Sequence, residues 1–208
     1  MISRRALLQG SVALLLVRDA LAQGRVERGI YRVRGDVRVN GEPAREGNQV
    51  RAGDSVTSGA DGEMVFVINR DAMLVRRNSN VSLLADGLRA ITGAVLSVFA
   101  SGQRKQIRTE TATIGIRGTG VYIEAEPQRT YVCTCYGQAE LEPIGDPASR
   151  EAVSTRHHEQ PRYIMASGAP QMIMRAPVIN HTDAELILLE SLVGRQPPFI
   201  GGGFRPYQ

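Results

Sequence analysis

Short apolar segments separated by glycine turns dominate the chain between residues 29 and 142. Residues 64–68 are a continuous apolar run of strand length, which favours a strand covered on both faces, and residues 94–100 are another apolar strand candidate. Val81 and Leu83 alternate with polar residues, a spacing that places apolar side chains on one face of a strand. Asn40-Gly41 is typical of a tight hairpin turn. The pattern predicts an all-β fold, a compact antiparallel β-sandwich or β-roll of many short strands.

The pattern changes after residue 142, where we expect an extension over residues 143–180 that packs on the β domain. One short α-helix is predicted within residues 181–194. Thr182 and Glu185 have the spacing of a capping box, and Gly194 can end the helix. Residues 195–208 contain Pro197-Pro198 and three consecutive glycines, so we expect a flexible tail.

Residues 1–22 have the plan of a signal peptide: a basic start, a short apolar middle and a small-residue exit. Arg4 and Arg5 precede two leucines, as in twin-arginine signals, and Ala20 and Ala22 form the cleavage site. An ordinary secretory signal is the alternative. Either signal predicts a soluble, exported protein, periplasmic in location.

The amino-acid composition restricts the classes of partner that the protein could bind. The net charge is +4, carried by 25 basic and 21 acidic residues that are spread along the chain without blocks. Aromatic residues are 5% of the chain and tryptophan is absent, which argues against base stacking and hence against nucleic acid. No run of eighteen apolar residues exists, so we expect no transmembrane segment.

Two glycine-rich segments, residues 53–66 and 111–124, carry a resemblance to a known family. Their motif residues are Gly53, Asp54, Asp61, Gly62, Arg117, Gly118, Thr119 and Gly120. In this order the motifs resemble the FecR domain, and the likeness covers roughly residues 30–142. It implies an extracytoplasmic sensing or ligand-binding module. The best-known relatives relay a signal to a sigma factor through a preceding transmembrane helix, and this chain departs from that plan.

The motif residues themselves favour structural roles. Gly-Asp and Asp-Gly pairs form turns, and Gly118 and Gly120 permit a close backbone approach between strands. Arg117 is expected to pin a turn. An anion-binding loop over residues 116–120 is the alternative, although the lysine and helix of a phosphate loop do not follow.

Cys133 and Cys135 lie two residues apart in a predicted strand, so both thiols point to the same face. Together with His157 and His158 they could form a site for zinc or another transition metal. Buried structural cysteines and redox-active thiols are the alternatives. His181 is interpreted as part of the helix start.

No sequence signature of an enzyme stands out, such as a nucleophile elbow or a phosphate loop. We therefore expect an exported, non-enzymatic FecR-like protein that binds a protein partner or a small ligand in the cell envelope. The alternative is a metal-binding or thiol-redox protein centred on the cysteine and histidine residues.

Overall fold

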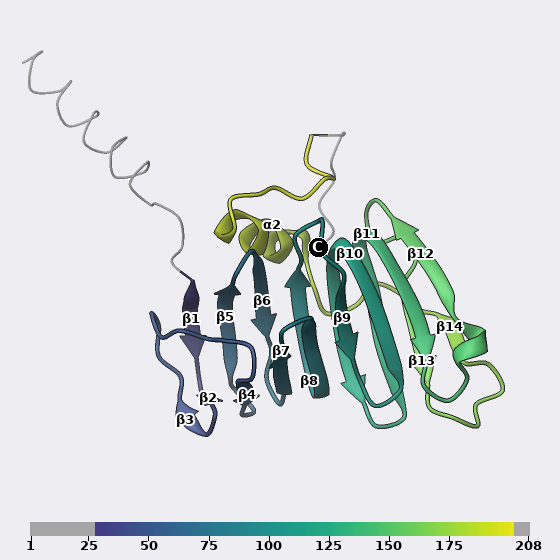
Figure 1. The fold of residues 1–208 in the computed structure, drawn as a ribbon, viewed down its shortest axis with the longest axis horizontal. Helices are drawn as coiled ribbons and strands as arrows, with labels where there is room; N and C mark the ends of the chain where they lie inside the picture. Colours follow the sequence, from purple (N-terminus) through teal and green to yellow (C-terminus); the bar gives the residue numbers. More distant parts are fainter. Residues whose placement is uncertain (1–27, 202–208) are drawn as a thin grey trace, which may run out of the picture.

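The computed structural model describes residues 28–201 of the chain (Figure 1). The export residues Arg4, Arg5, Ala20 and Ala22 lie outside the described residues. The described elements are β1 (Gly29–Arg34), β2 (Val37–Val39), β3 (Glu42–Pro43), β4 (Ser55–Ser58), β5 (Glu63–Ile68), β6 (Asp71–Val75), β7 (Asn80–Leu84), β8 (Gly87–Val98), β9 (Lys105–Arg108), β10 (Ala112–Glu126), β11 (Arg129–Pro143), the 3-10 helix η1 (Pro147–Ser149), β12 (Glu151–Thr155), β13 (Arg162–Met165), β14 (Ile173–Arg175) and α2 (Asp183–Leu192).

All fourteen strands belong to one hydrogen-bonded sheet, whose pairings form two runs. The first layer contains β1, β5, β6, β8, β10, β11, β13 and β14 in order. The second layer contains β3, β2, β4, β7, β8, β9, β10, β11 and β12. Every pair is antiparallel except β8–β9. The predicted all-β class with one short C-terminal helix is confirmed, and the 143–180 extension contributes strands β12, β13 and β14 to the sheet.

Three long strands take part in both layers, and each changes layer beside glycine. Strand β8 pairs with β7 up to Thr92 and with β10 from Gly93 onward. Strand β10 leaves β9 after Ile116 and joins β8 at Gly120. Strand β11 crosses at Gly137, where φ is +93° and an added Cβ would lie 2.6 Å from the Gly118 carbonyl oxygen. Glycine is therefore required at that crossing for both its conformation and its size.

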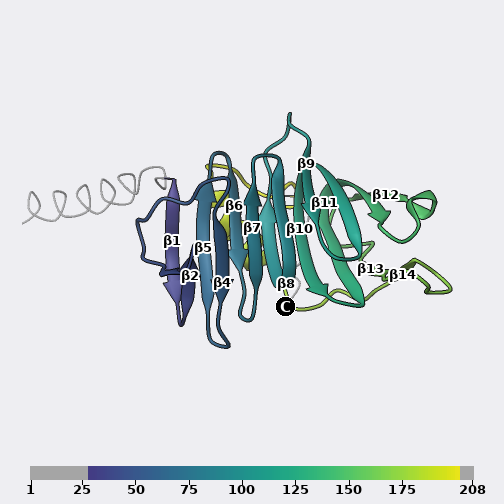
Figure 2. The same ribbon diagram turned by 60° about the horizontal axis from the view of Figure 1, so that its bottom comes forward.

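The strands β5 and β6 of the first layer are buried on both faces. In β5, Met64 and Phe66 point into a core between the two layers, whereas Val65 and Val67 point into a second core on the opposite face. This alternation explains why the strand reads as an unbroken apolar run. The second core lies beneath α2, which contacts β6 and β8 (Figure 2, where the helix lies behind the sheet).

Helix α2 begins with the predicted capping box: the Thr182 hydroxyl accepts from the Glu185 amide, and the Glu185 carboxylate accepts from the Thr182 amide. Gly194 follows its end with φ of +71°. The first part of the predicted flexible tail is anchored, because Arg195 bonds to Glu190 and Phe199 packs against Tyr136. Residues 202–208 lie outside the described range. Between residues 28 and 201, no helix has both the length and the apolar character needed to cross a bilayer.

Candidate functional site

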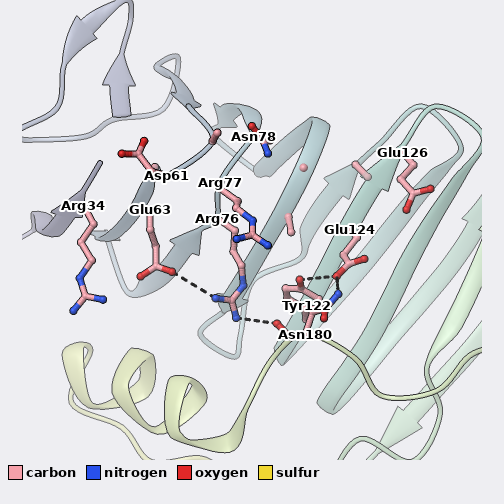
Figure 3. Close-up of a pocket in the computed structure, with 15 residues that line it drawn as sticks. Arg34, Asp61, Glu63, Arg76, Arg77, Asn78, Tyr122, Glu124, Glu126 and Asn180 are labelled. Carbon is pink, nitrogen blue, oxygen red and sulfur yellow. Dashed lines mark hydrogen bonds and ion pairs between the residues drawn. The ribbon is translucent and has the colours of Figure 1, made fainter. Parts of the chain in front are cut away.

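A cavity of about 690 Å³ opens on the outer face of the first layer, beside the start of α2 (Figure 3). Its lining comes from β1, β5, the turn after β6, β8, β10 and residue Asn180 in the segment that leads into α2. This volume lies within the range of small-molecule sites. The cavity thus joins parts of the chain that are more than a hundred residues apart.

Arg76 organises one wall of the cavity. Its guanidinium pairs with Glu185 at 2.8 Å and with Glu63 at 3.5 Å, and it also donates to the Asn180 carbonyl at 2.9 Å. Burial alone would lower the pKa of Arg76, but the neighbouring Glu185 carboxylate outweighs it and the pKa is raised. The Arg76 Nε atom is buried without a hydrogen-bond partner among the described residues.

Tyr122, Glu124 and Asn180 build the facing wall. The Tyr122 hydroxyl donates to Glu124 Oε1 at 2.8 Å, and the Asn180 side-chain amide donates to the same oxygen at 2.7 Å. Burial is the main cause that raises the pKa of Tyr122, and the hydrogen bond to Glu124 raises it further, so the hydroxyl stays protonated. Because these groups hold one another, the wall is formed in advance of any ligand.

The cavity is lined by charges of both signs. Arg77 points inward from the turn after β6 and has no ion pair within the described chain, while Glu124 and Glu126 lie across from it on β10 (Figure 3). Asp61 and Glu63 lie on the same side as Arg77, and Glu126 pairs with Arg129 at 3.0 Å. Gly93 and Ala94 of β8 lie between them with little side chain. The arrangement can hold a ligand that carries an anionic group near Arg77 and a cationic group near the glutamates. Sequence reasoning named only Asp61 and Gly62 of this lining, because no local motif joins the other residues.

The residues of the first FecR-like motif make structural contacts. Asp54 accepts from the Arg51 amide at 2.7 Å and from the Asn40 side chain at 2.8 Å, which closes the turn at Gly53 before β4. Asp61 accepts from the Asp36 amide at 3.2 Å. A Cβ on Gly62 would lie 2.3 Å from the Asp36 carbonyl oxygen. These contacts fit the predicted turn roles.

The second motif forms the crossing of β10 between the layers. Gly118 adopts φ of +57°, and an added Cβ on Gly120 would lie 2.4 Å from the Tyr136 ring. Thr119 donates to the Gln138 carbonyl at 2.8 Å. The Arg117 side chain is exposed and makes no hydrogen bond or ion pair in the described part of the chain, so the expectation that it pins a turn is not met. A strand, not a helix, follows the motif, which removes the main support for an anion-binding loop.

Beneath the cavity lies a buried group of four side chains: Cys133, Cys135, His158 and His181. Their candidate ligand atoms all lie within 4.8 Å of one another. His158 Nδ1 is 3.3 Å from the Cys133 sulfur and 3.0 Å from His181 Nε2. Both cysteines are free thiols. Three of the four side chains come from the sequence prediction.

The structure places the predicted His157 outside this group. Its Nε2 lies 2.9 Å from Asp183 Oδ1, and its ring packs on Phe199 at 4.6 Å between centroids. His181 takes the fourth position instead. Sequence reasoning assigned it to the helix start because it lies two residues before α2, and only the docking of that segment onto β11 brings it to the cysteines. Its unusual feature in the sequence is that it is the only histidine besides the adjacent pair.

The electrostatics of the group distinguish its two thiols. A hydrogen bond from Cys135 lowers the pKa of Cys133 to about 4, against the opposing effect of burial. Burial raises the pKa of Cys135. For His158, burial lowers the pKa, but the neighbouring Cys133 and Asp183 outweigh it and the pKa is raised. The two thiols therefore differ in acidity, with Cys133 the more acidic, and a bound cation would favour the thiolate form of both.

No protein-family model matches the chain, and no curated protein matches it in sequence. Two crystal structures of a "putative anti-sigma factor" from Parabacteroides distasonis are similar to it, each with a TM-score of 0.48 and 11% sequence identity. The similarity covers 59% of this chain and 58% of the other, so the chain matches less than two thirds of that protein's length. The FecR resemblance stays a prediction.

Proposed function

We propose that this chain is an exported, non-enzymatic β domain that binds a small zwitterionic ligand, such as a short peptide, in the cavity beside α2. The observation that supports the proposal is that Arg77, which has no ion pair within the described chain, faces Glu124 across the cavity.

The composition of the lining supports a binding role over a catalytic one. The described lining contains no serine, threonine, cysteine, lysine or histidine that could act as a nucleophile with a neighbouring base. One arginine and one glutamate of the lining, Arg76 and Glu63, pair with each other. A protein partner in the cell envelope is the other occupant that the sequence predicts.

A titration with tetra-alanine tests the ligand class. We expect the peptide with free ends to bind, and either acetylation of the amino end or amidation of the carboxyl end to weaken binding about tenfold, since each removes a charge-assisted contact. Arg77→Glu should abolish binding, whereas Arg45→Glu, an exposed arginine that does not line the cavity, should not. No binding by any form at millimolar concentration, or equal binding of the capped forms, would contradict the proposal.

Export is a separate part of the proposal and has its own test. Replacing Arg4 and Arg5 together with lysine should leave the precursor inside the cell, because twin-arginine export requires the arginine pair. Fractionation followed by immunoblotting measures this. Normal export of the double variant would remove the twin-arginine assignment without affecting the binding proposal.

A further inference from the structure

We propose that Cys133, Cys135, His158 and His181 bind one zinc ion in a closed, four-coordinate site beneath the cavity. This inference goes beyond the proposed function, because the site would stand even if no ligand entered the cavity. It rests on the convergence of the four side chains, on the partners of the two imidazoles and on the burial of the group.

The spacing of the ligand atoms suits one tetrahedral ion. Zinc bonds of about 2.0–2.3 Å place neighbouring ligand atoms roughly 3.3–3.8 Å apart around the metal. The structure has 3.3 Å between the Cys133 sulfur and His158 Nδ1, and 3.0 Å between His158 Nδ1 and His181 Nε2. The remaining ligand-atom pairs lie within 4.8 Å, so short movements of the four side chains would give the tetrahedral spacing.

The hydrogen bonds of the two imidazoles point their lone pairs at the same place. His181 Nδ1 lies 2.6 Å from the Ile179 carbonyl oxygen, which can only accept, so this nitrogen carries the proton and Nε2 has the lone pair. His158 Nε2 lies 3.0 Å from the Asp183 carboxylate, an arrangement that leaves Nδ1 as the ligand atom. Carboxylate and carbonyl partners of this kind orient metal-binding histidines.

His158 Nδ1 lies at the centre of the group, where either a shared proton or a metal ion can join the facing atoms. One ring nitrogen of His158 faces both the Cys133 sulfur and His181 Nε2, yet a nitrogen offers a single proton or a single lone pair in its plane. Two facing lone pairs repel unless a cation or a proton lies between them. One divalent cation would satisfy both contacts and the Cys135 thiolate as well.

The types of ligand atom and the burial of the site indicate which metal would bind and what role it would have. Two thiolates and two imidazoles in a tetrahedron are typical of structural zinc. A two-iron cluster with two cysteines and two histidines divides them between two irons, whereas here all four ligand atoms surround one centre. All four side chains are buried, and Tyr122 stacks on His181 at 4.6 Å between ring centroids. The site therefore has no open position for a substrate.

Such an ion would join three segments of the chain. Cys133 and Cys135 belong to β11, His158 to the loop after β12, and His181 to the segment before α2. Tyr131 also holds that last segment, since its hydroxyl donates to the Pro177 carbonyl at 2.9 Å. Because Asn180 precedes His181 and lines the cavity, the ion would also fix one cavity wall.

His181, which belongs to the proposed site, and His157, which lies beside it, provide a matched pair of variants. The chain is purified with a tag that lacks histidine, dialysed against a weak chelator and analysed for metals by mass spectrometry. We expect about one zinc per chain in the wild type and in His157→Ala, and nearly none in His181→Ala or in the Cys133→Ser, Cys135→Ser double variant. Equal loss in His157→Ala and His181→Ala would overturn the ligand assignment, and stoichiometric iron or copper would overturn the choice of metal.

A measurement on the unaltered sequence covers the case in which a variant does not fold. Cobalt(II) added to the chelated wild-type chain should give the strong visible and thiolate charge-transfer absorption of a tetrahedral cysteine site, and zinc should abolish it. A folded chain that binds neither ion, with both thiols reacting freely, would show that a shared proton rather than a metal joins Cys133 and His158. The peptide titration is read separately, so either proposal can fail alone.

Discussion

The core between the two layers and the core beneath α2 cover opposite faces of the same strands, yet they differ in chemistry. The core between the layers is built of aliphatic, methionine and phenylalanine side chains, such as Met64, Phe66 and Ile123. The core beneath α2 contains three tyrosines and both cysteines, and the buried Asp183 and Glu190 adjoin it. Strands alone close the first core, whereas a segment from the end of the chain closes the second.

This difference shows where a β-sandwich can accommodate polar groups. A buried polar group needs a partner with the right geometry, and strands offer few backbone groups that are not already paired. The C-terminal segment supplies such partners: the Ile179 carbonyl for His181, Asp183 for His158, and Glu190 for the Tyr136 hydroxyl. We therefore expect the core between the layers to determine stability, and the core beneath α2 to determine function.

The largest effect should come from the core between the layers. Phe66→Ala removes a fully buried ring and should lower the free energy of unfolding by about 3–5 kcal/mol, because a cavity remains where the ring was. Denaturant titration measures the loss. The zinc content of the chain that remains folded should not change. A loss below about 1 kcal/mol would mean that this core is not the main source of stability.

Removal of zinc should have the next largest effect. An ion present at about a thousandfold excess over its dissociation constant stabilises the folded chain by about 4 kcal/mol, and chelation withdraws that contribution. Thermal unfolding with and without a chelator measures the change, and added zinc should reverse it. Identical curves for wild type and for His181→Ala would contradict a role of the ion in closing the core beneath α2.

A smaller effect is expected at the start of α2. Thr182→Ala removes the side chain that accepts from the Glu185 amide and should cost about 1 kcal/mol. Ser191→Ala on the exposed side of the same helix is the control and should change stability by less than about 0.5 kcal/mol. If the two variants behave alike in denaturant titration, the cap does not contribute to the docking of the helix.

The smallest effect should arise on the outer face of the second layer, which is open to solvent. Glu110→Gln breaks the ion pair with Arg89, whose side chain is 52% exposed, and should change stability by less than about 0.5 kcal/mol. The same denaturant titration applies. A loss above about 1 kcal/mol would mean that this face is covered in solution. The outer face of the second layer would then not differ from that of the first layer, which α2 covers.

Much of the fold could be predicted from local pattern. The apolar run at residues 64–68 indicates a strand buried on both faces, because its side chains point alternately into the two cores. The capping box at Thr182 locates the helix start because capping depends on residues three positions apart. The two layers with shared strands could not be predicted, since the crossings at Gly93 and Gly137 depend on pairing between distant segments.

The candidate sites divide in the same way. The sequence by itself determined that Cys133 and Cys135 share one face, because alternation in a strand is a local property. Only the tertiary structure decided that His181 rather than His157 joins them, and that Arg77 faces Glu124 across a cavity. The first result depends on how the C-terminal segment packs on the sheet, and the second depends on the pairing of β6, β8 and β10. That packing is set by the sum of many contacts between distant residues, which no short pattern in the sequence records.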